Sequence, residues 1–378
     1  MPARPDVALP VLDRRARNRA LLARQLLLER SPMAAAQAVE HLVGLQAQSP
    51  WSPYHSLWSR LEGFDPDELG GLLVDRRVVR IVIMRGTVHL VTAGDCRFLR
   101  PLHDGFLRRA LLTSAWAPGL DGLDPDAVGA AGRRLVEAEP LPFGELGERL
   151  AGAFPGRDPA TLAQAVRATV PLVQVPPRAV WGRTGQVVVT SAEHWLGRPL
   201  EDHPSPERML LRYLAAFGPA SVMDVQTWSG LTRLRPVADR LGDRVVRFRD
   251  ESGRELLDLP DAPRPDPDTP APVRFLPDYD NLLRSHADRS HVVDDGVRRL
   301  LSRANGVVPG AVLVDGRVAA RWSIERARRA ATLIVTPFGR LARAARAEVA
   351  AEGARLLAHA AADAADHDVR IGEPEQSG

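Results

Sequence analysis

The sequence predicts an α+β protein in which three winged-helix units follow one another and a strand-rich region closes the chain. The order helix, helix, helix, strand, turn, strand, which is that of a winged helix, occurs three times in units of about 60–100 residues. Residues 260–272 are rich in Asp and Pro and predict a linker. Beyond them, Asp315-Gly316 between two apolar runs is a strong hairpin signal.

The first predicted unit covers residues 11–125. Arg85-Gly86 forms the turn between two β-branched strands, and Gly tolerates the turn conformation. The first helix is rich in arginine, so it either lies on phosphate or exposes a solvated face. Apolar residues at helical spacing predict the helices, and the two apolar runs predict the strands: helices over 12–28, 32–45, 51–61, 65–76 and 93–116, strands over 79–84 and 87–92.

The second and third predicted units repeat this order over residues 126–200 and 201–260. In the second unit an irregular loop, residues 176–184, separates the two strands. In the third, Ser221 is a helix cap and Gly218-Pro219 stops the preceding helix. The predicted helices cover residues 127–137, 143–153, 158–169, 206–217, 222–229 and 231–241, and the strands cover 171–175, 186–190, 245–248 and 256–259.

A C-terminal domain is predicted over residues 273–365. It contains a hairpin and a further strand, and it ends in a long Ala-rich helix. Residues 3–10 and 367–378 are expected to be a loose arm and a frayed tail. The predicted strands are 310–314, 317–322 and 331–336, and the predicted helix is 339–362.

Composition excludes several classes of protein. No apolar run approaches the roughly 18 residues of a membrane span, and no signal peptide precedes residue 10, so a cytoplasmic protein is expected. The single cysteine, Cys96, rules out an internal disulfide, a Cys-based zinc finger and a four-thiolate iron–sulfur cluster. We therefore predict neither a metal nor a cofactor.

All 50 basic side chains are arginine, because the chain contains no lysine. Arginine stays protonated far above pH 10, so the isoelectric point of about 9.7 accompanies a net charge of only +3 and is weak evidence for nucleic acid. Tandem winged helices favour nucleic acid more strongly, because their helices and wings present Arg side chains and N–H groups to phosphate. Winged helices that bind other proteins are the alternative.

Gly44-Leu45-Gln46-Ala47-Gln48-Ser49-Pro50 places two amides around one small residue where an apolar helical pattern ends. Alone, such a pair is most often a helix cap or a solvated loop. Three further segments change its interpretation: Met84-Arg85-Gly86-Thr87-Val88-His89-Leu90, Pro176-Pro177-Arg178-Ala179-Val180-Trp181-Gly182 and Asp280-Asn281-Leu282-Leu283-Arg284-Ser285-His286-Ala287-Asp288-Arg289.

In this order, the four segments resemble the winged-helix family of bacterial DNA glycosylases that includes AlkZ, the azinomycin-resistance enzyme, and YcaQ. The resemblance covers about residues 12–360. It implies three winged helices in a C-shaped arrangement with a β-rich, barrel-like C-terminal domain. It also implies excision of N7-alkylated guanine, including bulky adducts and interstrand crosslinks, from double-stranded DNA. Gln46 and Gln48 match the AlkZ branch, and Ala47 stands where the family usually has a larger aliphatic residue.

The resemblance makes Gln46 and Gln48 the predicted catalytic residues. Two neutral amides can hold and orient a water, although neither is a strong general base. Because no side-chain amine is present to form a Schiff base, water is the expected nucleophile at the sugar C1′ unless the N-terminal amine intervenes, and no AP lyase activity is expected. The branch serves antibiotic self-resistance in producing organisms, and that role is implied for this chain.

Each of the other candidate residues is weighed against a structural role. Arg85 and His89 on the first hairpin either enter a DNA groove or support the hairpin. Trp51 is either core or part of a lesion pocket. The remaining predicted DNA contacts, each weighed against a structural role, are Arg178, Trp181 and Arg183 on the second wing and His286, Asp288 and Arg289 after the linker.

The expected partner is double-stranded DNA carrying alkylated guanine, bound by a monomer without a membrane. A non-catalytic winged-helix regulator of DNA is the main alternative function, and an interaction module independent of nucleic acid is the third. Release of a free base from alkylated DNA distinguishes a DNA glycosylase from both alternatives.

Overall fold

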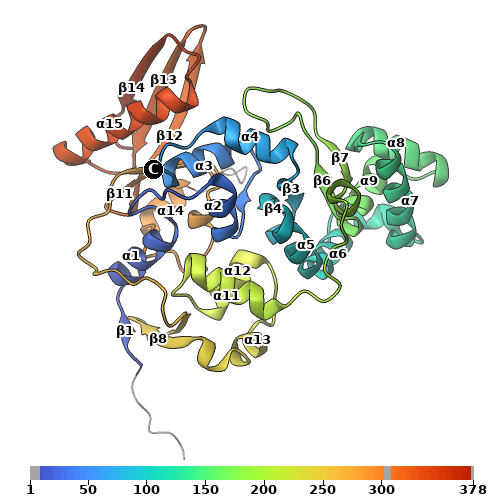
Figure 1. The fold of residues 1–378 in the computed structure, drawn as a ribbon, viewed down its shortest axis with the longest axis horizontal. Coiled ribbons are helices and arrows are strands. Elements are labelled where there is room, and N and C mark those ends of the chain that lie inside the picture. Colours follow the sequence, from blue (N-terminus) through green and yellow to red (C-terminus); the bar gives the residue numbers. More distant parts are fainter. Residues whose placement is uncertain (1–8, 302–307, 376–378) are drawn as a thin grey trace, which may run out of the picture.

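The computed structural model describes residues 9–301 and 308–375, and Figure 1 shows their arrangement. The predicted α+β class is confirmed: helices carry most of the first 260 residues, and strands dominate the C-terminal part. The C-shaped arrangement and the domain boundaries stay predictions.

The first unit surrounds a central β-hairpin with helices. Asp65 caps α4 through its side chain, which accepts from the Asp67 N–H, as the acidic helix start predicts. Its elements are β1 (Val11–Leu12), α1 (Arg14–Arg24), α2 (Ala35–His41), β2 (Leu45–Gln46), α3 (Ser52–Arg60), α4 (Pro66–Val74), β3 (Val78–Val82), the 3₁₀ turn η1 (Met84–Gly86), β4 (Val88–Thr92), α5 (Ala93–Leu102) and α6 (Asp104–Leu112).

The second unit agrees closely with its predicted helices. Its strands join those of the first unit, because β3 pairs with β6 antiparallel, and one six-stranded sheet of order β2-β4-β3-β6-β7-β5 runs through both units. The elements are η2 (Ala117–Leu120), α7 (Pro125–Ala138), β5 (Leu141–Pro142), α8 (Phe143–Ala153), α9 (Pro159–Thr169), β6 (Leu172–Gln174), β7 (Val188–Ser191) and α10 (Ala192–Leu196).

The third unit packs its helices on a three-stranded sheet of order β1-β8-β9. Ser221 caps its second helix in a capping box with Asp224, as predicted. Its last helix is shorter than the predicted 231–241. The elements are α11 (Pro206–Phe217), α12 (Val222–Ser229), α13 (Arg235–Asp239), η3 (Gly242–Arg244), β8 (Val246–Asp250) and β9 (Glu255–Asp258).

The C-terminal domain is an open five-stranded sheet, order β10-β11-β12-β13-β14, with α15 packed on it (Figure 1). Residues predicted as a frayed tail form its last strand instead, which pairs in parallel with β13. The sheet has two edges, so the barrel that we expected is not closed. The elements are β10 (Arg274–Leu276), η4 (Asn281–Leu283), α14 (Asp295–Leu301), β11 (Gly310–Val314), β12 (Arg317–Ala327), β13 (Ala330–Pro337), α15 (Arg343–Ala360) and β14 (Asp366–Ile371).

Helix α1 was expected to present its arginines to phosphate or solvent, and this is wrong for three of them. Arg17, Arg19 and Arg24 are each at most 3% exposed. Arg24 donates to both carboxylate oxygens of Asp258, at 2.6 and 2.9 Å, and Arg19 pairs with Asp315. Burying a charge requires such partners. The helix therefore joins the third unit to the C-terminal domain.

Candidate active site

The Gln46-Ala47-Gln48 segment lies along the edge of the six-stranded sheet and not at a helix end. The predicted second helix stops at His41, and Leu45–Gln46 is a short strand that pairs antiparallel with β4. The Ala47 N–H continues this ladder by donating to the Val88 carbonyl oxygen at 2.8 Å. Ala47 is fully buried, so the two amides flank a residue fixed in the core.

Gln46 is held by Arg85. Its side chain is 6% exposed, and Oε1 accepts a hydrogen bond from Arg85 Nη2 at 2.7 Å. A guanidinium N–H can only donate, so this contact fixes the amide with its oxygen toward Arg85 and its NH₂ group away. The second Arg85 terminal nitrogen donates to the Trp228 carbonyl oxygen. The guanidinium thus anchors Gln46 to the third unit.

Gln48 differs from Gln46 because its side chain is exposed. Its Oε1 accepts from the Val88 N–H at 3.0 Å, which ties it to β4. Each amide oxygen has a second lone pair, and each NH₂ keeps its donors. Gln48 is therefore the amide that solvent can reach, whereas Gln46 is buried.

Arg80 supports the backbone between the two glutamines. It is 2% exposed, and its Nη2 donates to the Ala47 carbonyl oxygen at 2.9 Å while Nε donates to Gln174 Oε1 at 3.1 Å. Burial, and next the charge of Arg178, lower the Arg80 pKa to about 10. Burial, and next Arg284, lower the Arg85 pKa to about 10. Both guanidiniums stay charged at neutral pH.

Neither Arg80 nor Arg85 forms an ion pair within the described part of the chain. Uncompensated positive charge beside an exposed edge attracts phosphate. In this structure the two arginines hold the segment, Arg80 through the Ala47 carbonyl oxygen and Arg85 through Gln46 Oε1.

Gly44 and Asn281 fix the approach to the motif. Gly44 has a φ of +88°, and a Cβ there would lie 2.6 Å from Val91 Cγ1, so only glycine fits. Its carbonyl oxygen accepts from Asn281 Nδ2 at 3.0 Å. The preceding Asp280 accepts from Arg60 through both oxygens, each at 2.9 Å. The segment after the linker therefore supports the motif from behind.

The predicted DNA contacts of His89 and His286 are wrong in this structure, because both side chains are buried, at 0% and 2% exposure. His89 Nδ1 lies 3.0 Å from the Thr87 carbonyl oxygen. His286 bonds to Ser285 Oγ and to the Phe217 carbonyl oxygen. Burial lowers the pKa of both imidazoles. Their role is structural.

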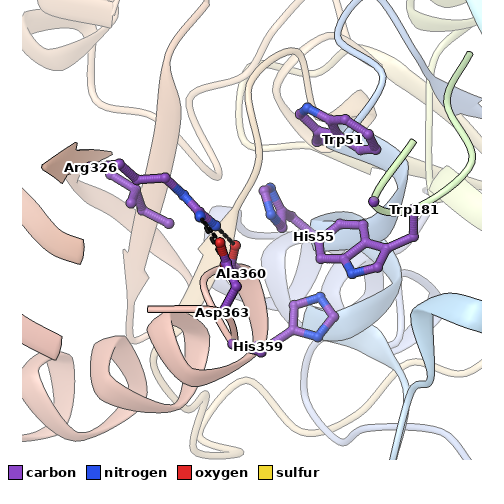
Figure 2. Close-up of a pocket in the computed structure, with 10 residues that line it drawn as sticks. Trp51, His55, Trp181, Arg326, His359, Ala360 and Asp363 are labelled. Atoms are coloured by element: carbon purple, nitrogen blue, oxygen red, sulfur yellow. Dashed lines mark hydrogen bonds and ion pairs between the residues drawn. The ribbon is translucent and has the colours of Figure 1, made fainter. Parts of the chain in front are cut away.

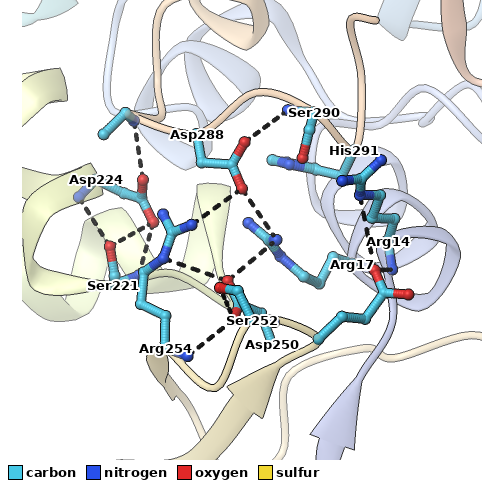
Figure 3. Close-up of polar contacts among 12 residues, drawn as sticks. Arg14, Arg17, Ser221, Asp224, Asp250, Ser252, Arg254, Asp288, Ser290 and His291 are labelled. Atoms are coloured by element: carbon cyan, nitrogen blue, oxygen red, sulfur yellow. Dashed lines mark hydrogen bonds and ion pairs between the residues drawn. The ribbon is translucent and has the colours of Figure 1, made fainter.

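Asp288 and Arg289 also hold the fold together. Figure 3 shows Asp288 between Arg17 and Arg254, with its Oδ2 3.6 Å from Arg17 Nη1 and 3.4 Å from Arg254 Nη2. Arg289 donates to the Leu283 carbonyl oxygen at 2.9 Å. The Asp288 contacts connect the C-terminal segment to α1 and the third unit, and the predicted DNA contact of Asp288 and Arg289 stays a prediction.

The second wing folds back on the first unit. Trp181 packs on Tyr54, with ring centroids 4.8 Å apart, and on Trp51 at 5.6 Å. Arg178 donates to the Gly185 carbonyl oxygen at 2.9 Å, and Arg183 is exposed. Trp51 and Trp181 line a pocket of about 660 Å³ together with residues of the C-terminal domain (Figure 2). Of the three predicted wing residues, Arg183 is the exposed one, and the predicted DNA contacts of the wing stay predictions.

Comparison with known proteins agrees with this geometry. The family model described as "DNA glycosylase AlkZ-like" matches residues 39–359. The chain belongs to the AlkZ-like DNA glycosylase family. It is therefore a DNA glycosylase, a hydrolase of N-glycosidic bonds that acts on DNA.

Two relatives of this family extend the comparison. An "Interstrand DNA cross-link repair glycosylase" of Streptomyces sahachiroi is 26% identical over 351 residues, covering 83% of this chain and 88% of the relative. The solved structure of Streptomyces sahachiroi DNA glycosylase AlkZ superposes with a TM-score of 0.79 at 21% identity, over 96% of this chain and all of that chain. The fold of this family member is thus that of AlkZ.

Two contributors to the site were not predicted. Arg80 is one arginine of many in the sequence, and only the pairing of β3 with β4 and β6 places it beside Ala47. Asn281 stands in one of the quoted segments, but its neighbours carried the DNA prediction. Its role is visible only in the structure, where its buried amide lies next to the Arg60–Asp280 pair and bonds to the Gly44 carbonyl oxygen.

Neither metal nor membrane features occur in the described ranges. No group of three or more His, Cys, Asp or Glu side chains there could hold a metal ion. No helix in residues 9–301 and 308–375 is long and apolar enough to cross a membrane.

Proposed function

We propose that this family member is a monofunctional glycosylase that hydrolyses the N-glycosidic bond of N7-alkylated guanine in double-stranded DNA, including bulky adducts and interstrand crosslinks. Gln46 and Gln48 are its catalytic residues. The observation that carries the proposal is the anchored amide pair at the sheet edge, with Gln46 bonded to Arg85 and Gln48 exposed. The relative named for interstrand crosslink repair supports the substrate class.

The chemistry suits neutral amides. Alkylation at N7 leaves guanine cationic, so the base departs without being protonated by the enzyme. The remaining task is to place a water against C1′ as the bond breaks. Gln48 can accept from that water or donate to it, and Gln46 orients the water or contacts the sugar through its free NH₂. Without a carboxylate, the acceleration is limited to lesions whose glycosidic bond is already weak.

Water is the nucleophile in this proposal because the chain has no lysine among its 50 basic side chains. A lyase step requires an amine that forms a Schiff base with the sugar aldehyde. The product is therefore an intact abasic site and a free base. The reaction uses neither metal nor cofactor.

DNA contact in this proposal rests on arginine. Arg85, Arg178 and the exposed Arg183 supply positive charge around the motif and on the second wing, and they suit contact with phosphate. The enzyme acts as a monomer. Its biological role is DNA repair or self-resistance to a DNA-alkylating natural product.

The proposal is tested by measuring free-base release from four duplexes, carrying N7-methylguanine, a bulky N7 adduct, an N7–N7 crosslink or no damage. We expect release from all three damaged duplexes and none from undamaged DNA. Binding of one defined sequence without base release overturns the proposal. Excision of methylguanine alone overturns the assignment to bulky adducts and crosslinks.

A further inference from the structure

A pocket of about 660 Å³ opens near the motif and takes walls from three parts of the chain. Figure 2 shows Trp51 and His55 from the start of α3, Trp181 from the second wing and His359 from the end of α15 around it. Across the view, Arg326 on β12 pairs with Asp363, with contacts of 2.8 and 2.9 Å. The pocket exists only because these parts pack together.

Aromatic rings form one side of this pocket. Trp51 meets Trp181 edge to face, at a centroid distance of 5.6 Å and an angle of 83°. The His359 ring stacks on Trp181 at 5.5 Å and 27°. His55 lies 6.3 Å from Trp181 and 6.2 Å from His359. Such walls bind flat rings by stacking and edge-to-face contact.

The pocket carries no net charge. Burial, and next His359, lower the His55 pKa to about 3, and burial lowers the His359 pKa to about 4, so both rings are neutral at pH 7. The Arg326 and Asp363 charges cancel each other. His359 Nε2 is buried without a hydrogen-bond partner in the described part of the chain. The walls therefore suit a large uncharged ring.

The pocket is close to the proposed catalytic amides. Trp51 follows Gln48 by three residues, so their Cα atoms are at most about 11 Å apart. A group attached to a guanine whose sugar lies at Gln48 can reach this distance. The volume lies in the range of about 300–1,000 Å³ that holds drug-sized ligands, which is more than a single base requires.

We propose that this pocket binds the planar aromatic group that a bulky adduct carries on guanine N7. The inference rests on the proposed function and names the substrate class that the site favours. The pocket then stabilises an adducted duplex through the attached ring, and the glycosidic bond is presented to Gln46 and Gln48. A methyl adduct gains nothing from it.

The test measures binding, not cleavage, so it does not depend on whether base release occurs. Duplexes with a 2′-fluorinated, and so slowly cleaved, N7-methylguanine or N7-(arylmethyl)guanine are titrated with the full chain. We expect wild type to bind the aromatic adduct more tightly. Trp181→Ala should lower the affinity ratio of aromatic to methyl adduct about tenfold, because stacking on one ring is worth about 5- to 150-fold in affinity.

Three further variants make the outcome decisive. Trp181→Phe keeps a ring and should restore most of the ratio. Trp195→Ala removes a tryptophan that stacks under Arg76, away from the pocket, and should keep the wild-type ratio. Ala362→Trp fills the pocket from its exposed rim and should lower the ratio even if Trp181→Ala unfolds. The inference is overturned if wild type binds the aromatic and methyl adducts equally well. It is also overturned if neither Trp181→Ala nor Ala362→Trp changes the affinity ratio of aromatic to methyl adduct. Absence of base release from all adducts overturns only the proposed function.

Discussion

Replacing Arg85 by methionine should slow base release by orienting Gln46 less well. The variant removes the hydrogen bond from Nη2 to Gln46 Oε1 at 2.7 Å and the bond to the Trp228 carbonyl oxygen, while keeping a side chain of similar length. The glutamine, now without its charged partner, regains its rotamers. The φ of 56° at this position is unaffected, because methionine and arginine share the same backbone demands.

The magnitude follows from the entropy of one side chain. Restricting a glutamine side chain to one rotamer costs about 1.5–2 kcal/mol of conformational entropy, and the hydrogen bond from Arg85 offsets this cost in the folded protein. If that cost is transferred to the barrier, the single-turnover rate falls about 10- to 30-fold. The unsatisfied Trp228 carbonyl adds about 1–3 kcal/mol of destabilisation, visible as a lower urea midpoint.

The assay is single-turnover release of methylguanine at saturating enzyme, together with the dissociation constant for undamaged duplex. A positioning role predicts a large fall in rate and a small change in binding. Arg85→Lys, which keeps the charge and a single donor nitrogen with three N–H groups, should recover the rate to within about fivefold of wild type. Arg134→Met removes an exposed charge on α7 and should leave the rate unchanged. A folded Arg85→Met enzyme that works at the wild-type rate refutes the reasoning.

Three other predictions concern stability and the reaction. Gly44→Ala should lower the free energy of unfolding by about 1–3 kcal/mol, because residue 44 has a positive φ and the alanine Cβ would lie 2.6 Å from Val91 Cγ1. An unchanged urea midpoint would contradict this prediction. The free energy of unfolding should fall as the pH drops below about 6.5, because burial lowers the His103 pKa to about 4 and the unfolded chain therefore takes up the proton first. His103 alone should account for a loss of about 2 kcal/mol between pH 7 and 5, measured by urea unfolding at both pH values. Equal stability at the two pH values would argue against a buried neutral ring. Borohydride should trap no covalent enzyme–DNA complex, since no lysine is present, and a trapped complex would point to the N-terminal amine.

Local signals predicted the helices well. The α11 bounds agree with the prediction because Ser205-Pro206 starts the helix and Gly218-Pro219 ends it, and both are properties of neighbouring residues. Asp158 and Ser221 cap their helices in the same way. Such elements need no knowledge of the rest of the chain.

Features that depend on distant partners were harder to predict. The segment around Gln46 is a strand only because β4 offers a partner edge, and the C-terminal residues form β14 only because β13 is beside them. Whether an arginine is buried also depends on distant partners. Arg24 meets Asp258 and is hidden, whereas Arg183 has no such partner in the described ranges and is exposed, yet their local sequences do not distinguish them.

The candidate site shows the same difference between local signals and contacts between distant residues. The Gln-x-Gln motif was identified because it is local and matches a family pattern, and the structure adds that Gln46 is buried and Gln48 exposed. The predicted contacts of His89 and His286 failed because their burial is set by sheet pairing and by the third unit. Arg80 and Asn281 act on backbone carbonyls of the motif, and such contacts leave no pattern in the sequence.

The role of the two amides is tested most directly by single-turnover release of N7-methylguanine from a duplex by wild type, Gln46→Ala and Gln48→Ala, each shown to be folded and to bind undamaged DNA. Our account predicts that both variants lose at least about tenfold in rate, equivalent to about 1.4 kcal/mol of barrier. It also predicts the larger loss for Gln48→Ala, because that amide is the exposed one. Full rates for both variants would contradict the assignment of catalysis to this pair.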